Sequence, residues 1–183
     1  AETLWQSLLE GRSGIATLNR FDSEHYLSSW AACIDGLEAP QGCSLLDPLL
    51  EQLADQLGPV PRLTRLLVAS TKGEIDCLER AYRAGDLLPQ SVLFEPLLEK
   101  ISRRFDLADP GMNINAACAS STIALARGAA MIASGEAASV LIYAADIVSE
   151  FVFSGFSALQ ALSPEPCQPF DQQRKGLNLG EAG

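Results

Sequence analysis

The sequence contains no apolar run of the ~20 residues that a membrane-spanning helix requires. Its opening residues, AETLWQSLLEGRSG, also lack the basic segment followed by an apolar stretch that marks a secretory signal. Both absences favour a soluble, cytoplasmic protein. The 183 residues and 48% hydrophobic content fit an ordered globular chain with a single domain.

Basic residues are scarce, because 13 Lys and Arg stand against 23 Asp and Glu and give a formal net charge of −10. Nucleic-acid binding requires a concentrated basic surface, so this composition argues against that class of function. The five cysteines are odd in number, widely separated and without a CxxC pair. Their spacing indicates neither a structural zinc site nor a disulfide framework, and it fits a reducing compartment.

Several catalytic motifs are also missing. The STKG segment that begins at Ser70 lacks the glycine spacing and the GK[ST] ending of a phosphate-binding loop. Residues 155–159, GFSAL, do not form the GxSxG elbow of a serine hydrolase. The single histidine, His25, lies between Glu24 and Tyr26; it can be interpreted as a general base or, more simply, as a surface residue.

The most informative feature that is present is a stretch of small and aliphatic residues from Met112 to Asp146. Residues 112–117 predict a buried strand, residues 120–134 a helix, and residues 140–145 a second buried strand. Together they predict a right-handed βαβ crossover in an α/β fold. Arg127 is the only charged residue of the helix, so we expect the helix to be buried in a layered domain.

Cys118 falls at the bend between the first strand and the helix. The unpaired N–H groups and the positive dipole end of a helix N-terminus favour a thiolate there. A cysteine in that position is a candidate nucleophile. The alternative is that it is a small core residue, as cysteines among alanines commonly are.

The other periodic segments complete the α/β pattern. Helices are expected over residues 3–10 and 47–57, around 75–82 and from 96 to 105, with a buried strand over 65–70. Pro164, Pro166 and Pro169 exclude regular structure before the segment PFDQQRKGLNLGEAG.

Two segments resemble the β-ketoacyl synthases of fatty acid and polyketide synthesis. NINAACASST is similar to the family's nucleophile segment, and FSGFSALQALS followed by CQPFDQQRKGLNLGEAG resembles its Gly-Phe, Ala-Leu-Ser, Pro-Phe-Asp and Gly-Glu-Gly-Ala-Gly run. The opening LWQSLLEGRSGIATLNRFD is similar to the family's first helix and loop. Gly176–Leu179 and Gly180–Gly183 depart slightly from the residues usual in the family. These departures leave the nucleophile Cys118 unchanged.

The resemblance implies a thiolase-like α/β fold, with layered helices around a mixed, mostly parallel sheet. Residues 1–183 would form the N-terminal domain of such a synthase, and both ends look cut. The family's two catalytic histidines and lysine would lie in the second half of the fold, and His25 matches neither histidine.

The resemblance also implies an acyltransferase mechanism. Cys118 would accept an acyl group from acyl carrier protein, with its own backbone N–H contributing to the oxyanion hole. Malonyl-carrier protein would then condense with the acyl-enzyme in a decarboxylative Claisen reaction. No metal or cofactor is implied. Phe153, Phe156 and Leu159 are candidates for an acyl channel, although aromatic residues at this spacing also suit a plain core.

Partners follow from the same likeness. The family is typically dimeric through the strand before the nucleophile, here residues 112–116, as a homodimer or with a related subunit. Arg62 with Arg65, or Arg103 with Arg104, are candidates for docking an acidic carrier protein, although a solvated helix face explains the second pair more simply. Two alternatives stay open: a catalytically silent partner of the chain-length-factor type, and an inactive structural fragment. The acyl chain and the pathway, whether fatty acid, polyketide or polyene, are not indicated.

Overall fold

The computed structural model describes residues 2–183, which form two compact units. The first unit combines the chain up to Asp35 with Val148–Glu181. The second unit combines Gly36–Ile147 with Ala182–Gly183. Within residues 2–183, no helix is both long enough and apolar enough to cross a membrane.

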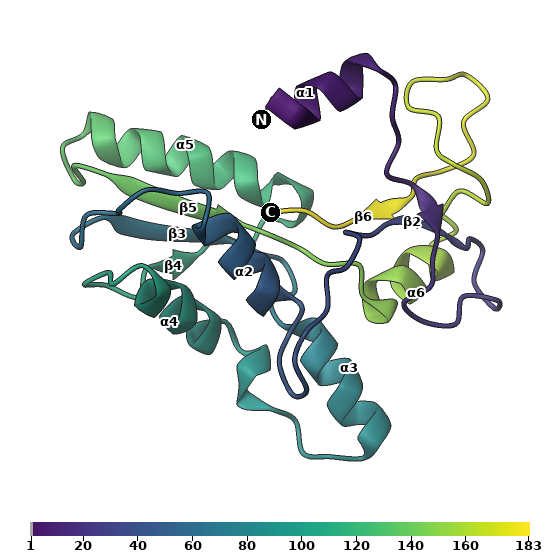
Figure 1. Ribbon diagram of the computed structural model, residues 1–183, viewed down its shortest axis with the longest axis horizontal. Helices are drawn as coiled ribbons and strands as arrows, with labels where there is room; N and C mark the ends of the chain where they lie inside the picture. The colour runs from purple at the N-terminus through teal and green to yellow at the C-terminus, as the bar shows by residue number, and fades with distance from the viewer. Residues whose placement is uncertain (1) are drawn as a thin grey trace. The chain divides into compact units, whose positions relative to one another are not determined.

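The second unit is built on a parallel three-stranded sheet in the order β4-β3-β5 (Figure 1). The strands span Arg65–Ala69 (β3), Met112–Asn113 (β4) and Val140–Ala144 (β5). The central strand β3 is buried over its last four residues, as expected for a parallel strand covered on both faces. The strands predicted over 65–70 and 140–145 are confirmed to within one residue, but only β3 is buried as predicted, because four of the five residues of β5 are partly exposed.

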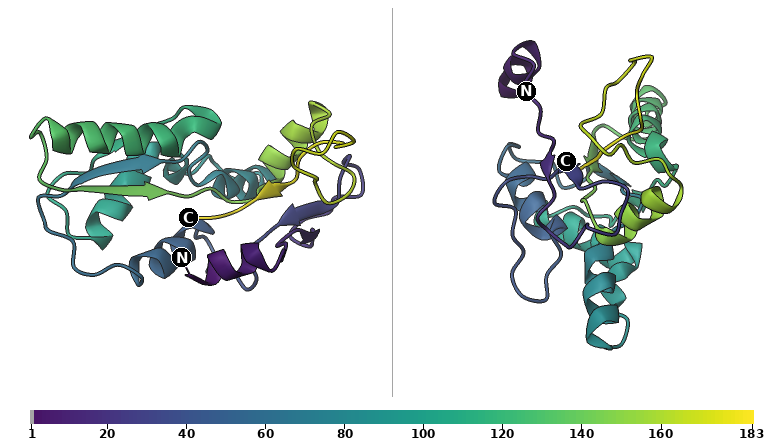
Figure 2. Two further views of the ribbon diagram at one scale, coloured as in Figure 1. Left: turned by 90° about the horizontal axis from the view of Figure 1, so that it is seen from above. Right: turned by 90° about the vertical axis from the view of Figure 1, so that its right-hand side faces the viewer.

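Helices lie on both faces of this sheet. Figure 2 shows α5 along one face and α2 and α4 towards the other. The helices of the unit are Leu46–Ala54 (α2), Ile75–Ala84 (α3), Phe94–Arg104 (α4) and Ser120–Ala133 (α5), with short 3-10 turns at Gln90–Val92 (η1) and Ala117–Ala119 (η2). The four helices predicted for this part of the chain are thus present.

The helix α5 buries only one of its faces, so the prediction that it is buried is wrong. Ala124, Gly128 and Met131 face the sheet and are buried, and a Cβ on Gly128 would lie 3.2 Å from the Ile142 side chain. Leu125 is 60% exposed on the remaining surface. The sheet covers a single stripe of a helix, and the apolar residues outside that stripe are open to solvent.

The first unit contains a small mixed sheet in the order β1-β2-β6, antiparallel between β1 and β2 and parallel between β2 and β6. Its elements are Glu2–Leu9 (α1), Ala16–Thr17 (β1), Trp30–Ala32 (β2), Glu150–Ala158 (α6) and Leu179–Gly180 (β6). Its core gathers around Phe153, whose ring meets those of Phe21 and Tyr26 at centroid distances of 5.4 and 5.5 Å.

Glu181 fastens three segments of the first unit through one carboxylate. It forms a two-pronged ion pair with Arg20, in which Nη2 and Oε1 lie 2.8 Å apart. It also accepts hydrogen bonds from the backbone N–H of Ile34 at 2.7 Å and of Val148 at 3.1 Å. Burial favours a higher pKa for Glu181, but these charged and backbone donors outweigh it, and the pKa lies below its ordinary value.

Candidate active site

Cys118 lies in a sharp bend between β4 and α5. Ala117, directly before it, adopts a left-handed backbone with φ of 50°, which is costly for a residue with a Cβ. The Ser120 hydroxyl supports the bend by accepting from Ala116 N–H at 2.9 Å and donating to Ala117 C=O at 2.7 Å. The strand predicted over residues 112–117 is therefore too long, because β4 ends at Asn113 and the bend takes up the rest.

The bend places Cys118 where a reagent can reach it. Its side chain is exposed, and it is followed at once by the 14-residue helix α5. The alternative of a cysteine buried in the core does not describe this structure. The first turn of α5 contains no acidic side chain to offset the positive end of its dipole.

A network of polar side chains connects the carboxyl ends of the three parallel strands beside this bend. The Asn113 amide bonds to both backbone groups of Ser70, with Oδ1 accepting at 3.4 Å and Nδ2 donating at 3.3 Å. Asn115 donates to Thr71 C=O at 3.3 Å and accepts from Ala117 N–H at 3.5 Å. The chain segment before Cys118 is thus joined to the end of β3.

Asp146, which follows β5, joins the same network from the other edge. Its carboxylate accepts from the Ser70 hydroxyl at 3.3 Å and from the N–H and hydroxyl of Thr71 at 3.4 and 3.2 Å. Its backbone pairs with Ala182 in an antiparallel bridge. Burial raises the pKa of Asp146 above its ordinary value, although the bonds from Thr71 and Ser70 and the charge of Lys72 oppose that rise.

A pocket of about 250 Å³ opens beside Cys118. Most of its wall consists of small side chains, from Ala69, Ala117, Ser120, Ser121, Ala144, Ala145, Ala182 and Gly183. Cys118 and Asp146 are the two remaining residues of the wall. The chemistry available to a ligand in this pocket therefore comes from one thiol, one carboxylate, two hydroxyls and the backbone.

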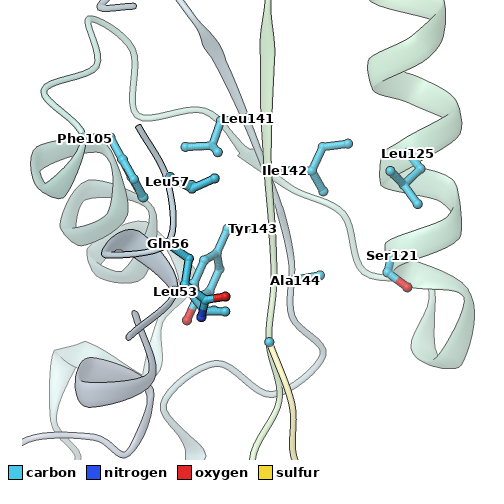
Figure 3. Close-up of a pocket in the computed structure, with 11 residues that line it drawn as sticks. Leu53, Gln56, Leu57, Phe105, Ser121, Leu125, Leu141, Ile142, Tyr143 and Ala144 are labelled. Atoms are coloured by element: carbon cyan, nitrogen blue, oxygen red, sulfur yellow. The ribbon is translucent and has the colours of Figure 1, made fainter. Parts of the chain in front are cut away.

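A second, mainly apolar pocket of about 380 Å³ lies along β5 (Figure 3). Leu141 and Tyr143 point to one side of β5 and Ile142 and Ala144 to the other. Ser121, Ala144 and Gly183 line both this pocket and the one at Cys118. The Tyr143 hydroxyl is buried and has no hydrogen-bond partner among the residues that the structure describes, and burial raises the pKa of Tyr143.

The three acyl-channel candidates belong to the first unit, on and directly after α6, whereas Cys118 belongs to the second. Phe153 is fully buried in the aromatic core, and Phe156 packs against that core. Leu159 is 75% exposed. Their role in a channel remains a prediction.

The arginine pairs predicted to dock a carrier protein are all engaged by carboxylates. Arg65 pairs with Asp109 at 3.1 Å, and Arg103 pairs with Glu99 at 2.7 Å. The other two arginines also form ion pairs, Arg62 with Asp106 and Arg104 with Glu51. These surfaces are therefore less basic than the arginines alone indicated. His25 is exposed on the first unit and lies beside the Tyr26 ring.

Sequence reasoning missed Asp146 and the two asparagines of the strand-end network. A usable signal was present, because polar residues that directly follow parallel strands meet at one edge of the sheet. In the side chains described by the structure, those of residues 4–90 and 92–183, no cluster of three or more His, Cys, Asp or Glu could hold a metal ion.

Comparisons with known proteins agree with this architecture. Residues 99–183 match the family model described as the N-terminal domain of beta-ketoacyl synthase. A 3-oxoacyl-[acyl-carrier-protein] synthase 2 of Vibrio cholerae is 24% identical over 98% of this chain and 51% of its own length. The chain thus spans about half the length of that relative.

Two solved structures share the fold. The ishigamide ketosynthase/chain length factor superposes with a TM-score of 0.81 and 26% identity, covering 99% of this chain and 52% of its own. A type II polyketide synthase acyl-carrier protein in complex with its ketosynthase gives a TM-score of 0.74 at 19% identity, covering 98% and 52%.

Proposed function

We propose that this chain carries the nucleophile of a condensing enzyme. The proposal starts from the match of both sequence and fold to the N-terminal half of the β-ketoacyl synthases. That match confirms the predicted resemblance and the thiolase-like α/β class. The observation that carries the proposal is the exposed Cys118 at a bend before α5, inside the segment that matches the family model. Residues 1–183 act in this proposal as the synthase N-terminal domain.

The proposed reaction begins with transfer of an acyl group to Cys118. The thiolate attacks the carbonyl carbon of an acyl thioester, the carbonyl oxygen becomes an oxyanion, and the carrier thiolate leaves as the Cys118 thioester forms. The Cys118 backbone N–H at the bend is proposed as one oxyanion donor, worth roughly 3 kcal/mol.

Condensation then consumes the acyl-enzyme. A malonyl thioester loses carbon dioxide, and the electron pair of the broken C–C bond becomes a carbanion that attacks the Cys118 thioester. The Cys118 thiolate leaves, and the product is a β-ketoacyl thioester. The resemblance implies that histidines of the second half of the fold assist decarboxylation, so residues 1–183 supply the acylation step of the proposal.

The proposed partners are acyl carrier protein and a second synthase subunit. One related structure contains a carrier protein bound to its ketosynthase, and another pairs a ketosynthase with a chain length factor. We infer that a second subunit pairs through residues 112–116, since β4 is an edge strand of its sheet and Met112 is exposed.

A chain-length-factor role is the second candidate, because one related structure includes such a subunit. The cysteine weighs against it, since these partners usually lack the nucleophile. Acylation separates the two functions directly.

The test is to incubate the folded chain with octanoyl-carrier protein and to map adducts by mass spectrometry. The proposal predicts a hydroxylamine-labile octanoyl group on Cys118 that disappears in Cys118→Ala and persists in the matched control Cys167→Ala. Absence of an adduct, or equal acylation of Cys118 and Cys167, would contradict it.

A further inference from the structure

The pocket beside Cys118 contains a carboxylate, that of Asp146, which has no role in the reaction proposed above. Of the ten residues in its wall, Asp146 is the only one besides the cysteine whose side chain can carry a negative charge. We propose that Asp146 determines by charge which groups acylate the free Cys118 thiolate, so that uncharged acyl groups are favoured in this first step and groups bearing a carboxylate near the reacting carbon are disfavoured. The substrate part of this inference rests on the proposed function.

The carboxylate is held in place rather than free to swing into solvent. Its side-chain partners, Ser70 and Thr71, are all donors, as suits an ionised carboxylate that can only accept. Ser70 is fully buried, and it also bonds to Asn113 in the segment before the bend. The same network that shapes the Cys118 bend therefore fixes the position of the charge.

The charge is not cancelled by an adjacent cation. Among the side chains that the structure describes, Asp146 forms no ion pair; the cation that acts on it is Lys72, at longer range and exposed to solvent. A fixed negative charge in a small pocket repels a second negative charge, and because Asp146 is only half-buried, salt can still screen that repulsion. An incoming acetyl or longer acyl group lacks such a charge, whereas a malonyl group has one and is disfavoured as the group that acylates Cys118.

Two small reagents isolate this effect from the rest of the chemistry. Iodoacetamide and iodoacetate alkylate the same thiolate by the same step, in which a C–S bond forms and iodide leaves, but only iodoacetate is anionic. Their rate ratio at Cys118 is independent of the thiolate fraction. The ratio at Cys167, measured by mass spectrometry in the same digest, corrects for the field of the chain's net charge of −10.

The variants are Asp146→Asn, Asp146→Glu and, as a control, Asp106→Asn. Asp106 is highly exposed, does not line the pocket, and has a φ of 50° that asparagine tolerates well. The inference predicts that Asp146→Asn lowers the corrected iodoacetamide-to-iodoacetate ratio at Cys118 by about fivefold. Asp146→Glu and Asp106→Asn should leave it within about twofold.

An unchanged ratio in Asp146→Asn overturns the inference, as does an equal change in Asp106→Asn. If circular dichroism shows that Asp146→Asn does not fold, the inference is tested on the wild-type chain by the dependence of its corrected ratio on salt. Raising salt from about 0.01 M to 1 M shortens the screening length from about 30 Å to 3 Å, and the corrected ratio at Cys118 should fall. A corrected ratio independent of salt contradicts the inference.

Failure of this inference and failure of the proposed function are distinguishable. The alkylation ratio requires no synthase activity. If Asp146 changes the ratio but Cys118 is not octanoylated, the proposed function is wrong and the effect of the Asp146 charge on reagents at Cys118 still holds. If Cys118 is octanoylated but Asp146 does not change the ratio, the proposed function is supported and the inference about Asp146 is wrong.

Discussion

Replacing Glu181 with glutamine should strongly destabilise the first unit. The Glu181 side chain is 0% exposed, and its Arg20 partner is 21% exposed. Glutamine keeps the shape but removes the charge, and its amide N–H₂ group faces donors instead of acceptors. The guanidinium and the N–H groups of Ile34 and Val148 would then compete for one neutral oxygen.

The size of the effect follows from these contacts. Breaking a buried ion pair by removing one partner costs about 3–5 kcal/mol, and Arg20 recovers part of this because water reaches it. A buried backbone donor left without a partner adds about 1–3 kcal/mol. We therefore expect Glu181→Gln to lower the free energy of unfolding by about 2–4 kcal/mol at neutral pH.

Acid should reduce this difference. The pKa of Glu181 is lower in the folded chain than its ordinary value, so its contribution to stability is complete above the unfolded pKa. That contribution is lost as the pH falls through the folded pKa, because wild-type Glu181 then becomes neutral like the variant. The difference in stability between wild type and Glu181→Gln should shrink steadily as the pH falls below about 4.3.

The assay is urea unfolding followed by tryptophan fluorescence, since Trp30 lies on β2 of the same unit. Glu165→Gln is the matched control, because Glu165 pairs with Lys175 at 3.0 Å where both side chains are roughly half exposed. The control should change the unfolding free energy by less than about 1 kcal/mol. A loss below about 1 kcal/mol in Glu181→Gln, or one that does not shrink in acid, would refute the reasoning.

Three further changes test other parts of the structure, each measured by urea unfolding. Ser120→Ala should cost about 1–3 kcal/mol and slow Cys118 alkylation, because the hydroxyl supports the strained Ala117; unchanged alkylation would count against that support. Gly111→Ala should cost at least about 2 kcal/mol, since its φ is 81° and a Cβ would lie 2.4 Å from the Leu66 carbonyl oxygen; a neutral result would contradict that contact. Tyr143→Phe should leave stability unchanged or raise it by up to about 2 kcal/mol, because the buried hydroxyl lacks a partner; a loss above 1 kcal/mol would show that it has one.

Local pattern was enough to predict most elements of the second unit. The apolar run in RLLVAS predicted β3, and the small residues after Cys118 predicted α5, because both signals lie within one element. The length of β4 was not predictable in the same way. It depends on Ala117 adopting a left-handed backbone that the nearby Ser120 hydroxyl stabilises, and alanine is not a residue type that indicates a left-handed backbone.

The candidate site likewise contains one residue that local sequence predicted and one that it did not. Cys118 was found from its place before a helix, together with the motif around it. Asp146 was not found, because its proximity to Cys118 arises only when β3, β4 and β5 are assembled and their ends meet. The exposure of α5 could not be predicted either, since apolar composition shows that a helix face can be buried but not what covers it.

The central claim is that the fold activates Cys118 rather than merely exposing it. The most direct measurement is the iodoacetamide alkylation rate of Cys118 in the folded chain, compared with the rate of the same cysteine in the urea-unfolded chain at the same pH. Activation at the start of α5 predicts a rate at least about threefold higher in the folded chain, with the other four cysteines slower when folded. A folded rate equal to or below the unfolded rate would contradict the account.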